Sequence, residues 1–126
     1  MWSHGSFYWN ELMTRDVEAA KKFYGAALGW KFESMSMPMG AYWIAKAGDA
    51  PVGGLFPIDK PEFDGAPELW FAYIAVDDAD ARAKKFVTEG GKILREPFDV
   101  PNVGRIVIVQ DKAGVMLGLM KPFAEQ

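Results

Sequence analysis

One carboxylate, Glu11, stands in an aromatic stretch where acid–base chemistry would be favoured. Residues 6–13 read SFYWNELM, without Pro or Gly, which is typical of a strand. Because side chains alternate along a strand, Glu11 shares a face with Trp9 and Met13. Burial between such neighbours raises the pKa of a carboxylate, so Glu11 is a candidate general acid or base, or a partner for a cationic ligand group. A salt bridge to Arg105, or exposure at the strand end, is the structural alternative.

Two further side chains, those of Arg105 and His4, are of kinds that often bind ligands or take part in catalysis. Arg105 follows a turn at residues 101–104 and could hold an anionic group through a forked hydrogen bond, or it could be an exposed residue at a strand end. His4, the single histidine, precedes the first strand and is expected to be solvated. One terminal histidine cannot complete a Ser–His–Asp set, and a chain without cysteine has no thiolate nucleophile or thiolate zinc site.

The sequence pattern that predicts the helices and strands holding these residues occurs twice in the chain. The motif AKKF occurs at residues 20–23 and again at residues 83–86, each time behind an aspartate suited to cap a helix and ahead of glycine. Each half then reads strand–helix–strand–strand–strand. The expected strands are residues 6–13, 30–37, 41–45, 51–56, 69–76, 92–96, 105–110 and 115–120. We therefore predict a duplicated structural unit.

Composition limits the class of protein. A chain of 126 residues with ordinary apolar and charged fractions is the size of one globular domain. Its net charge of −3 disfavours a nucleic-acid partner. No segment resembles a signal peptide or a membrane span, and the lack of cysteine suits a reducing compartment, so we expect a cytoplasmic protein with no membrane association. Aromatic residues make up 14%, enough to line a cavity or fill a dense core.

Three motifs carry a family resemblance. Residues 11–30 (ELMTRDVEAAKKFYGAALGW), the VDD at residues 76–78 followed by Gly90 and Gly91, and the turn at residues 111–114 resemble the vicinal oxygen chelate superfamily. That superfamily includes glyoxalase I, bleomycin-resistance proteins and extradiol dioxygenases.

The resemblance implies an α+β fold for the whole chain. Two βαβββ modules would form a cup-shaped mixed sheet with a central cleft, helices on the outside, in a chain that pairs as a homodimer. We expect one domain over residues 1–126, with modules at residues 5–58 and 69–121 and a linker at residues 59–68, which is rich in Pro and acids.

The resemblance also indicates which strand faces line the cleft. The strongest candidates for ligand-binding residues are Trp9, Phe71, Tyr73 and Met116, joined by Glu11 and Arg105. Such rings and thioethers suit flat organic ligands, although they could instead fill a core or a dimer interface. Tyr42 and Trp43 are adjacent, so only one of them can face the cleft, and residues 34–40 are expected to form a hairpin tip that covers it.

The metal site of the family is expected to be absent. Carrying the family's ligand positions onto this chain gives Trp9, Gly54 or a neighbour, Phe71 and Gly118, none of which can ligate. Glu11 alone is a poor site for a divalent metal, which needs several converging donors. We predict no metal and no other cofactor.

Two functions remain. The first is a metal-independent protein that binds a small, mostly apolar or aromatic molecule, as the bleomycin-resistance branch does. The second is a glyoxalase-like or dioxygenase-like lyase or oxidoreductase that uses a non-standard metal site or acid–base chemistry by Glu11.

Overall fold

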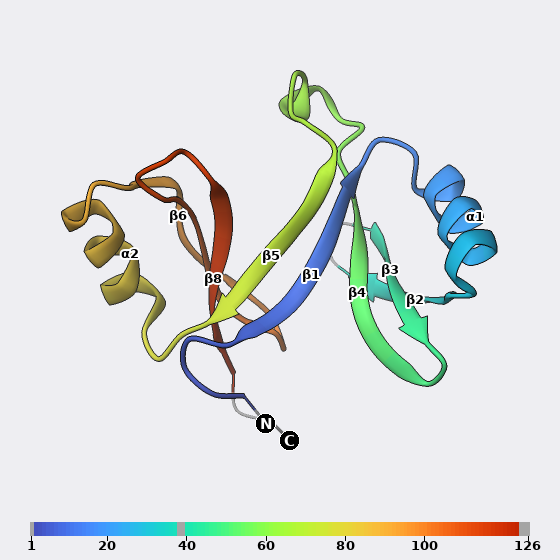
Figure 1. Cartoon of the computed structure of the whole chain (residues 1–126), viewed down its shortest axis with the longest axis horizontal. Helices are drawn as coiled ribbons and strands as arrows, with labels where there is room; N and C mark the ends of the chain where they lie inside the picture. Colours follow the sequence, from blue (N-terminus) through green and yellow to red (C-terminus); the bar gives the residue numbers. More distant parts are fainter. Residues whose placement is uncertain (1, 38–39, 124–126) are drawn as a thin grey trace. The chain divides into compact units, whose positions relative to one another are not determined.

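The computed structural model describes residues 2–37 and 40–123 and confirms the predicted α+β class with its repeated βαβββ order (Figure 1). The described elements are β1 (Phe7–Thr14), α1 (Val17–Leu28), β2 (Lys31–Met37), β3 (Gly40–Ala47), β4 (Ala50–Pro57), the short 3-10 helix η1 (Pro61–Phe63), β5 (Leu69–Ala75), α2 (Ala79–Thr88), β6 (Lys92–Val100), β7 (Gly104–Gln110) and β8 (Met116–Pro122). The tip of the expected hairpin, residues 38–39, lies outside the described residues.

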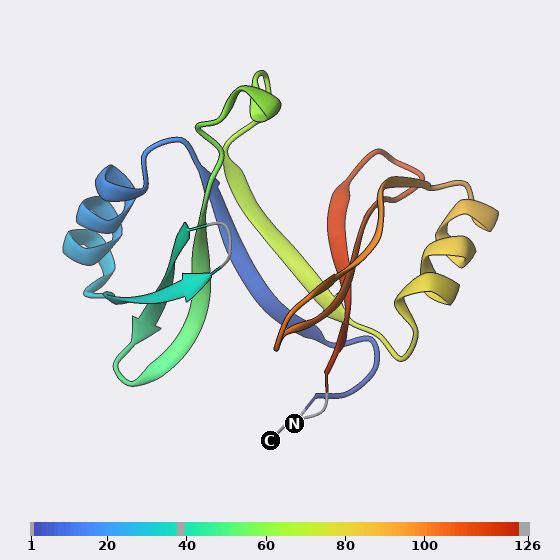
Figure 2. The ribbon, with the colours of Figure 1, turned by 180° about the vertical axis from the view of Figure 1, so that it is seen from behind.

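The chain forms two compact units, which Figure 2 shows from behind. The N-terminal unit is Asn10–Phe71, and the C-terminal unit consists of the described residues of Met1–Trp9 and Ala72–Gln126. The N-terminal unit contains β2, β3, β4 and most of β1, in the order β2-β3-β4-β1, and the C-terminal unit contains most of β5 with β8, β7 and β6, in the order β5-β8-β7-β6. In each, one parallel pair (β1 with β4, β5 with β8) is combined with antiparallel neighbours.

Both helices begin at the predicted aspartates. Asp16 accepts a hydrogen bond from the Ala19 N–H at 2.9 Å, and Asp78 accepts one from the Ala81 N–H at 3.0 Å. These side chains satisfy donors that the first helical turn leaves without partners. α1 ends at Gly29 in the left-handed conformation, with φ 72°, as its position in the sequence predicts. α2 ends one residue before the predicted glycines, at Glu89.

Each unit has its own core between its helix and one face of its strands. In the N-terminal unit Leu12, Ala20 and Leu55 are buried together, and partly buried aromatic side chains pack on them. In the C-terminal unit the buried cluster is Val76, Ala79, Ala83, Val107, Val109 and Leu119. The alternating pattern therefore sends Leu12 toward α1 and its neighbour Glu11 to the opposite face.

Among the described residues no helix is both long and apolar enough to cross a membrane.

Candidate functional site

Glu11 is buried on the sheet face that points away from α1. It lies opposite Gly54 in the parallel pairing of β1 with β4 and is only 7% exposed. The Tyr42 hydroxyl donates a hydrogen bond of 2.6 Å to Glu11 Oε2. Neither structural alternative for Glu11 holds, because this carboxylate is not at an exposed strand end and Arg105 is bound to other carboxylates.

The structure decides between Tyr42 and Trp43. Trp43 packs with the core cluster under α1, and Lys21 Nζ lies 3.3 Å from its ring centroid. Tyr42, the next residue along β3, must therefore point to the opposite face, where it reaches Glu11. Sequence reasoning left this choice open because two adjacent aromatic residues fit either face equally well.

Gly54 provides the space that Tyr42 occupies. A Cβ placed on Gly54 would lie 1.7 Å from the Tyr42 hydroxyl oxygen and 2.2 Å from its Cζ. The ring therefore lies directly against the β4 backbone, a position that only glycine permits. Glu11, Tyr42 and Gly54 come from three strands, β1, β3 and β4, and form a single packed arrangement within the N-terminal unit.

The two aromatic residues of β5 that were predicted to bind a ligand are both buried. Phe71, in the N-terminal unit, is 4% exposed, and Tyr73, in the C-terminal unit, is also buried. Ile74 and Val76 pack into the cluster under α2, so alternation sends Tyr73 to the other face of β5, where it pairs in register with Gly118. Trp9 is partly buried, and Met116 is exposed at the start of β8.

Arg105 is fully engaged with carboxylates of its own unit. Its Nε and Nη2 donate to Asp80 at 2.6 and 3.1 Å, and its Nη1 donates to Asp99 at 3.0 Å. These hydrogen bonds lower the pKa of Asp80 and raise the pKa of Arg105. The Arg105 guanidinium on β7 thus connects Asp80 of α2 with Asp99 of β6. In this structure its N–H donors are directed at protein carboxylates.

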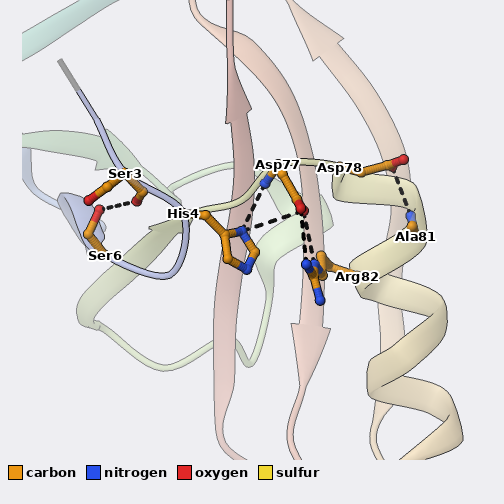
Figure 3. Close-up of polar contacts among 7 residues, drawn as sticks. All are labelled: Ser3, His4, Ser6, Asp77, Asp78, Ala81 and Arg82. Atoms are coloured by element: carbon orange, nitrogen blue, oxygen red, sulfur yellow. Dashed lines mark hydrogen bonds and ion pairs between the residues drawn. The ribbon is translucent and has the colours of Figure 1, made fainter.

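His4 is not simply solvated, as the sequence suggested (Figure 3). Its Nδ1 accepts a hydrogen bond of 3.0 Å from the Asp77 N–H, and Arg82 holds the Asp77 carboxylate through two hydrogen bonds of 2.9 and 3.0 Å. The contact arises because residues just before β1 pair with the end of β5: Gly5 N donates to Ala75 O at 2.7 Å. That pairing is a tertiary feature, which no local pattern around His4 indicates.

The donor set does not fit a divalent metal. Over residues 2–37 and 40–123, no group of three His, Cys, Asp or Glu side chains lies close enough to hold one. At Gly54, where a ligating side chain would have to begin, the Tyr42 phenol fills the space. Trp9, Phe71 and Gly118 supply no nitrogen or oxygen ligand from their side chains.

The chain has two βαβββ units and a candidate site on the sheet face away from α1. A comparison of the sequence with models of protein families identifies the class of proteins that has this arrangement. The family model of the Glyoxalase/Bleomycin resistance protein/Dioxygenase superfamily matches residues 7–119. The chain therefore belongs to this superfamily, as the sequence motifs suggested.

Two longer relatives match nearly the whole chain. The chain is 42% identical over 123 residues to "Putative glyoxylase CFP32" of Mycobacterium tuberculosis, covering 97% of this chain and 46% of that protein. It is 31% identical over 129 residues to "Anthracycline biosynthesis protein DnrV" of Streptomyces peucetius, covering 93% of this chain and 47% of that protein. The chain thus spans about half the length of these relatives.

Two solved structures share the fold at low identity. A hypothetical protein of Bacillus halodurans has a TM-score of 0.74 and 12% identity, over 98% of this chain and 99% of that one. A methylmalonyl-CoA epimerase in complex with methylmalonyl-CoA has a TM-score of 0.64 and 17% identity, over 97% of each chain.

Proposed function

We propose that this protein binds a small, mostly apolar or aromatic organic molecule without the help of a metal ion, in the manner of the bleomycin-resistance branch of its superfamily. The N-terminal unit would hold the ligand on the sheet face away from α1, around Glu11 and Tyr42. We also expect it to work as a cytoplasmic homodimer with no nucleic-acid partner. The net charge of −3 and the absence of cysteine support that setting.

The observation that carries this proposal is the placement of Tyr42 over Gly54. The phenol occupies the place from which a fourth-strand metal ligand would extend, and its hydroxyl donates a hydrogen bond to the Glu11 carboxylate. A metal would need Glu11 to rotate away from Tyr42, and would then find too few other donors. The arrangement is instead suited to direct contact with an organic molecule.

The chemistry of this face indicates the class of ligand. Strand pairing places Met13, Met35, Phe56 and Ile44 on the same face as Glu11 and Tyr42, together with Glu33, which pairs with Lys46. Such a surface is largely apolar, adaptable and polarizable. A buried carboxylate beside a phenol adds one strongly polar position, which would favour a ligand with a hydroxyl or ammonium group on a flat apolar body. The similarity to a protein named for anthracycline biosynthesis supports polycyclic aromatic ligands.

One observation favours an enzymatic alternative. The 2.6 Å hydrogen bond between Tyr42 and Glu11 is short, and it joins two groups that can transfer protons. Glu11 could remove a proton from a bound molecule while the phenol stabilises the charge that develops. This lyase-like or isomerase-like function uses the same two residues and the same ligand face.

A binding titration with an anthraquinone probe tests the proposal. We expect saturable binding of the probe to metal-depleted protein, at least about tenfold weaker in Glu11→Gln or Tyr42→Phe, which corresponds to the loss of one charge-assisted hydrogen bond. The matched control is Glu18→Gln, because Glu18 is an exposed carboxylate on α1, away from the ligand face, and it pairs with Lys21. Absence of saturable binding, or equal affinity in all four proteins, would refute the proposed site.

The enzymatic alternative has its own test. Incubation with an anthraquinone that carries a ketone side chain, in deuterated water, would reveal proton exchange at the acidic carbon next to that ketone. Exchange that the wild type catalyses and Glu11→Gln does not would establish acid–base catalysis, whereas binding without exchange would leave the binding function.

A further inference from the structure

Two lysines lie side by side on the proposed ligand face. Lys31 of β2 and Lys46 of β3 are paired in register. Phe32 and Trp43 pack with the core cluster under α1. Alternation along the strands therefore sends both lysines to the opposite face, the one that holds Glu11. Like charges at directly opposite positions of a sheet repel each other, so this pair of lysines costs stability unless anions neutralise it.

The two lysines share one ion-paired carboxylate. Lys46 Nζ donates a hydrogen bond of 3.0 Å to Glu33 Oε2. Lys31 forms no ion pair within the part of the chain that the structure describes. Arg105 of the C-terminal unit has the opposite balance, because its single guanidinium is bound to two carboxylates. The lysine pair of the N-terminal unit thus has positive charge that a second anion could neutralise.

The exposure of the two ion-paired side chains shows which one a ligand could displace. The Glu33 side chain is 68% exposed on β2, at the edge of the sheet, so its carboxylate can turn into water. The Lys46 side chain is only 29% exposed, and β3 lies between β2 and β4. Lys31 is exposed and also borders a groove beside α1. Lys46 is therefore the lysine held on this face, and an incoming anion could replace Glu33 without leaving the ammonium group unpaired.

We infer that the ligand of this face carries an anionic group, such as a carboxylate, at the end opposite the group that Glu11 binds, and that Lys46 holds this anion. The inference rests on the proposed function, because it assigns the second polar end of the same ligand. Lys31 adds a further positive charge beside the anion. A carboxylate that meets an ammonium group on a partly buried face forms a charge-assisted hydrogen bond, which is stronger than a bond from a neutral acceptor.

The spacing of the two polar positions fits a flat ring system. Glu11, Gly54 and Ile44 are aligned across β1, β4 and β3, and Lys46 lies two residues beyond Ile44. With strands about 4.8 Å apart and about 3.3 Å per residue, the Cα atoms of Glu11 and Lys46 are roughly 12 Å apart along the sheet. The apolar side chain of Ile44 lies between them. A ligand of three fused rings with polar groups at its two ends would span this distance.

Two anthraquinone probes that differ in one group test the inference. Both carry a hydroxymethyl group at one end; at the other end the acid probe carries a carboxylate and the amide probe a neutral carboxamide. The wild type should bind the acid probe at least about tenfold more tightly than the amide probe. Lys46→Met should bind the two probes equally. Lys84→Met is the matched control, because Lys84 is an exposed lysine on α2 of the other unit, and it should keep the preference.

Glu33→Gln separates anion binding from a purely structural ion pair. Because Glu33 competes with the ligand for Lys46, Glu33→Gln should tighten binding of the acid probe by roughly two- to fivefold and leave the amide probe unaffected by this competition. An ion pair that only maintains the fold would give the same sign in both variants: Glu33→Gln and Lys46→Met would both weaken binding of the acid probe, and the inference would be overturned.

The remaining outcomes distinguish this inference from the proposed function. Equal affinity of the wild type for the two probes, with both lost in Glu11→Gln, would overturn this inference alone. A preference for the acid probe that survives Lys46→Met would also overturn it. Acid-probe binding that depends on Lys46 and is unchanged in Glu11→Gln would support the anion site and refute the proposed role of Glu11. Absence of binding by either probe would overturn both.

Discussion

Phe23 and Phe86 occupy the same place in the two copies of AKKF, yet Phe23 is 65% exposed while Phe86 packs against the core of the C-terminal unit. The two helices start alike, from Asp16 and Asp78 caps, and each buries an alanine of the motif, Ala20 or Ala83. The residues shared by the two copies thus fix where each helix begins and which alanine it buries. The residues around them differ, and they decide whether the phenylalanine of the motif is exposed or packed.

The sheet faces away from the helices also carry different side chains at equivalent positions of the two units. Glu11 lies five residues before the Asp16 cap (16 − 11) and pairs with Gly54, and Tyr73 lies five residues before the Asp78 cap (78 − 73) and pairs with Gly118. The same structural position is therefore a carboxylate in one unit and a phenol in the other. The two units share these backbone registers, whereas the candidate acid–base residues lie in the N-terminal unit.

The largest expected effect on stability comes from truncating one buried leucine in the core of either unit. Leu55 and Leu119 are buried leucines, one in each unit. Replacing either with alanine should lower the free energy of unfolding by roughly 3 kcal/mol, because a cavity forms where the side chain was. Chemical denaturation followed by intrinsic fluorescence measures this loss. A single shifted transition in both variants would show that the units unfold together, and two separate transitions would show that each unit is independently stable.

A smaller effect is expected at Gly54. Gly54→Ala would push the Tyr42 ring out of its place and break its hydrogen bond to Glu11, at a cost of about 2 kcal/mol. Gly25→Ala is the matched control: it lies within α1, its added methyl would meet nothing closer than 3.5 Å, and it should raise stability by roughly 0.5–1 kcal/mol. Equal stability of the two variants would disprove the packing of Tyr42 against Gly54.

The helix caps should contribute equally in the two units. Asp16→Ala and Asp78→Ala each remove one hydrogen bond to the first helical turn, so each should lower the free energy of unfolding by about 1 kcal/mol. Thermal or denaturant unfolding of the two variants measures the comparison. A loss confined to one variant would mean that the capped turns are not equivalent.

The smallest effect depends on pH and belongs to the C-terminal unit alone. Hydrogen bonds from Arg82 lower the pKa of Asp77 from 3.8 to about 2, whereas the equivalent position in the N-terminal unit is Arg15. A lowered carboxylate pKa contributes stability that is complete above pH 3.8 and is lost as the pH falls toward 2.

Arg82→Met should therefore return the pKa of Asp77 toward its ordinary value and remove that acid-dependent part of stability. Carboxyl NMR titration measures the pKa directly. His4→Ala is the control, because His4 makes a smaller contribution than Arg82 to the low pKa of Asp77. An unchanged titration of Asp77 in Arg82→Met would contradict the assigned cause.

Most of the fold could be predicted from the sequence because local rules decide it. Asp16, Gly29 and Asp78 are specified by helix-end chemistry, and alternation along β5 places Tyr73 and Ile74 on opposite faces. The contact between Tyr42 and Glu11 could not be predicted from the sequence, because the two residues are 31 positions apart. They meet only because of the order of the strands in the sheet and the space that Gly54 leaves for the Tyr42 ring. For the same reason the sequence left open whether Arg105 held an anionic ligand group or was exposed at a strand end, and it did not indicate the carboxylates of Asp80 and Asp99 that Arg105 binds.

Metal analysis combined with probe binding on one preparation of protein tests the central claim most directly. Our account predicts that protein exposed to Ni, Zn, Mn or Fe and then desalted retains no stoichiometric metal, and that its affinity for the anthraquinone probe is the same before and after chelation. A divalent ion retained at one per chain in the wild type and lost in Glu11→Gln, together with binding that requires this ion, would contradict it.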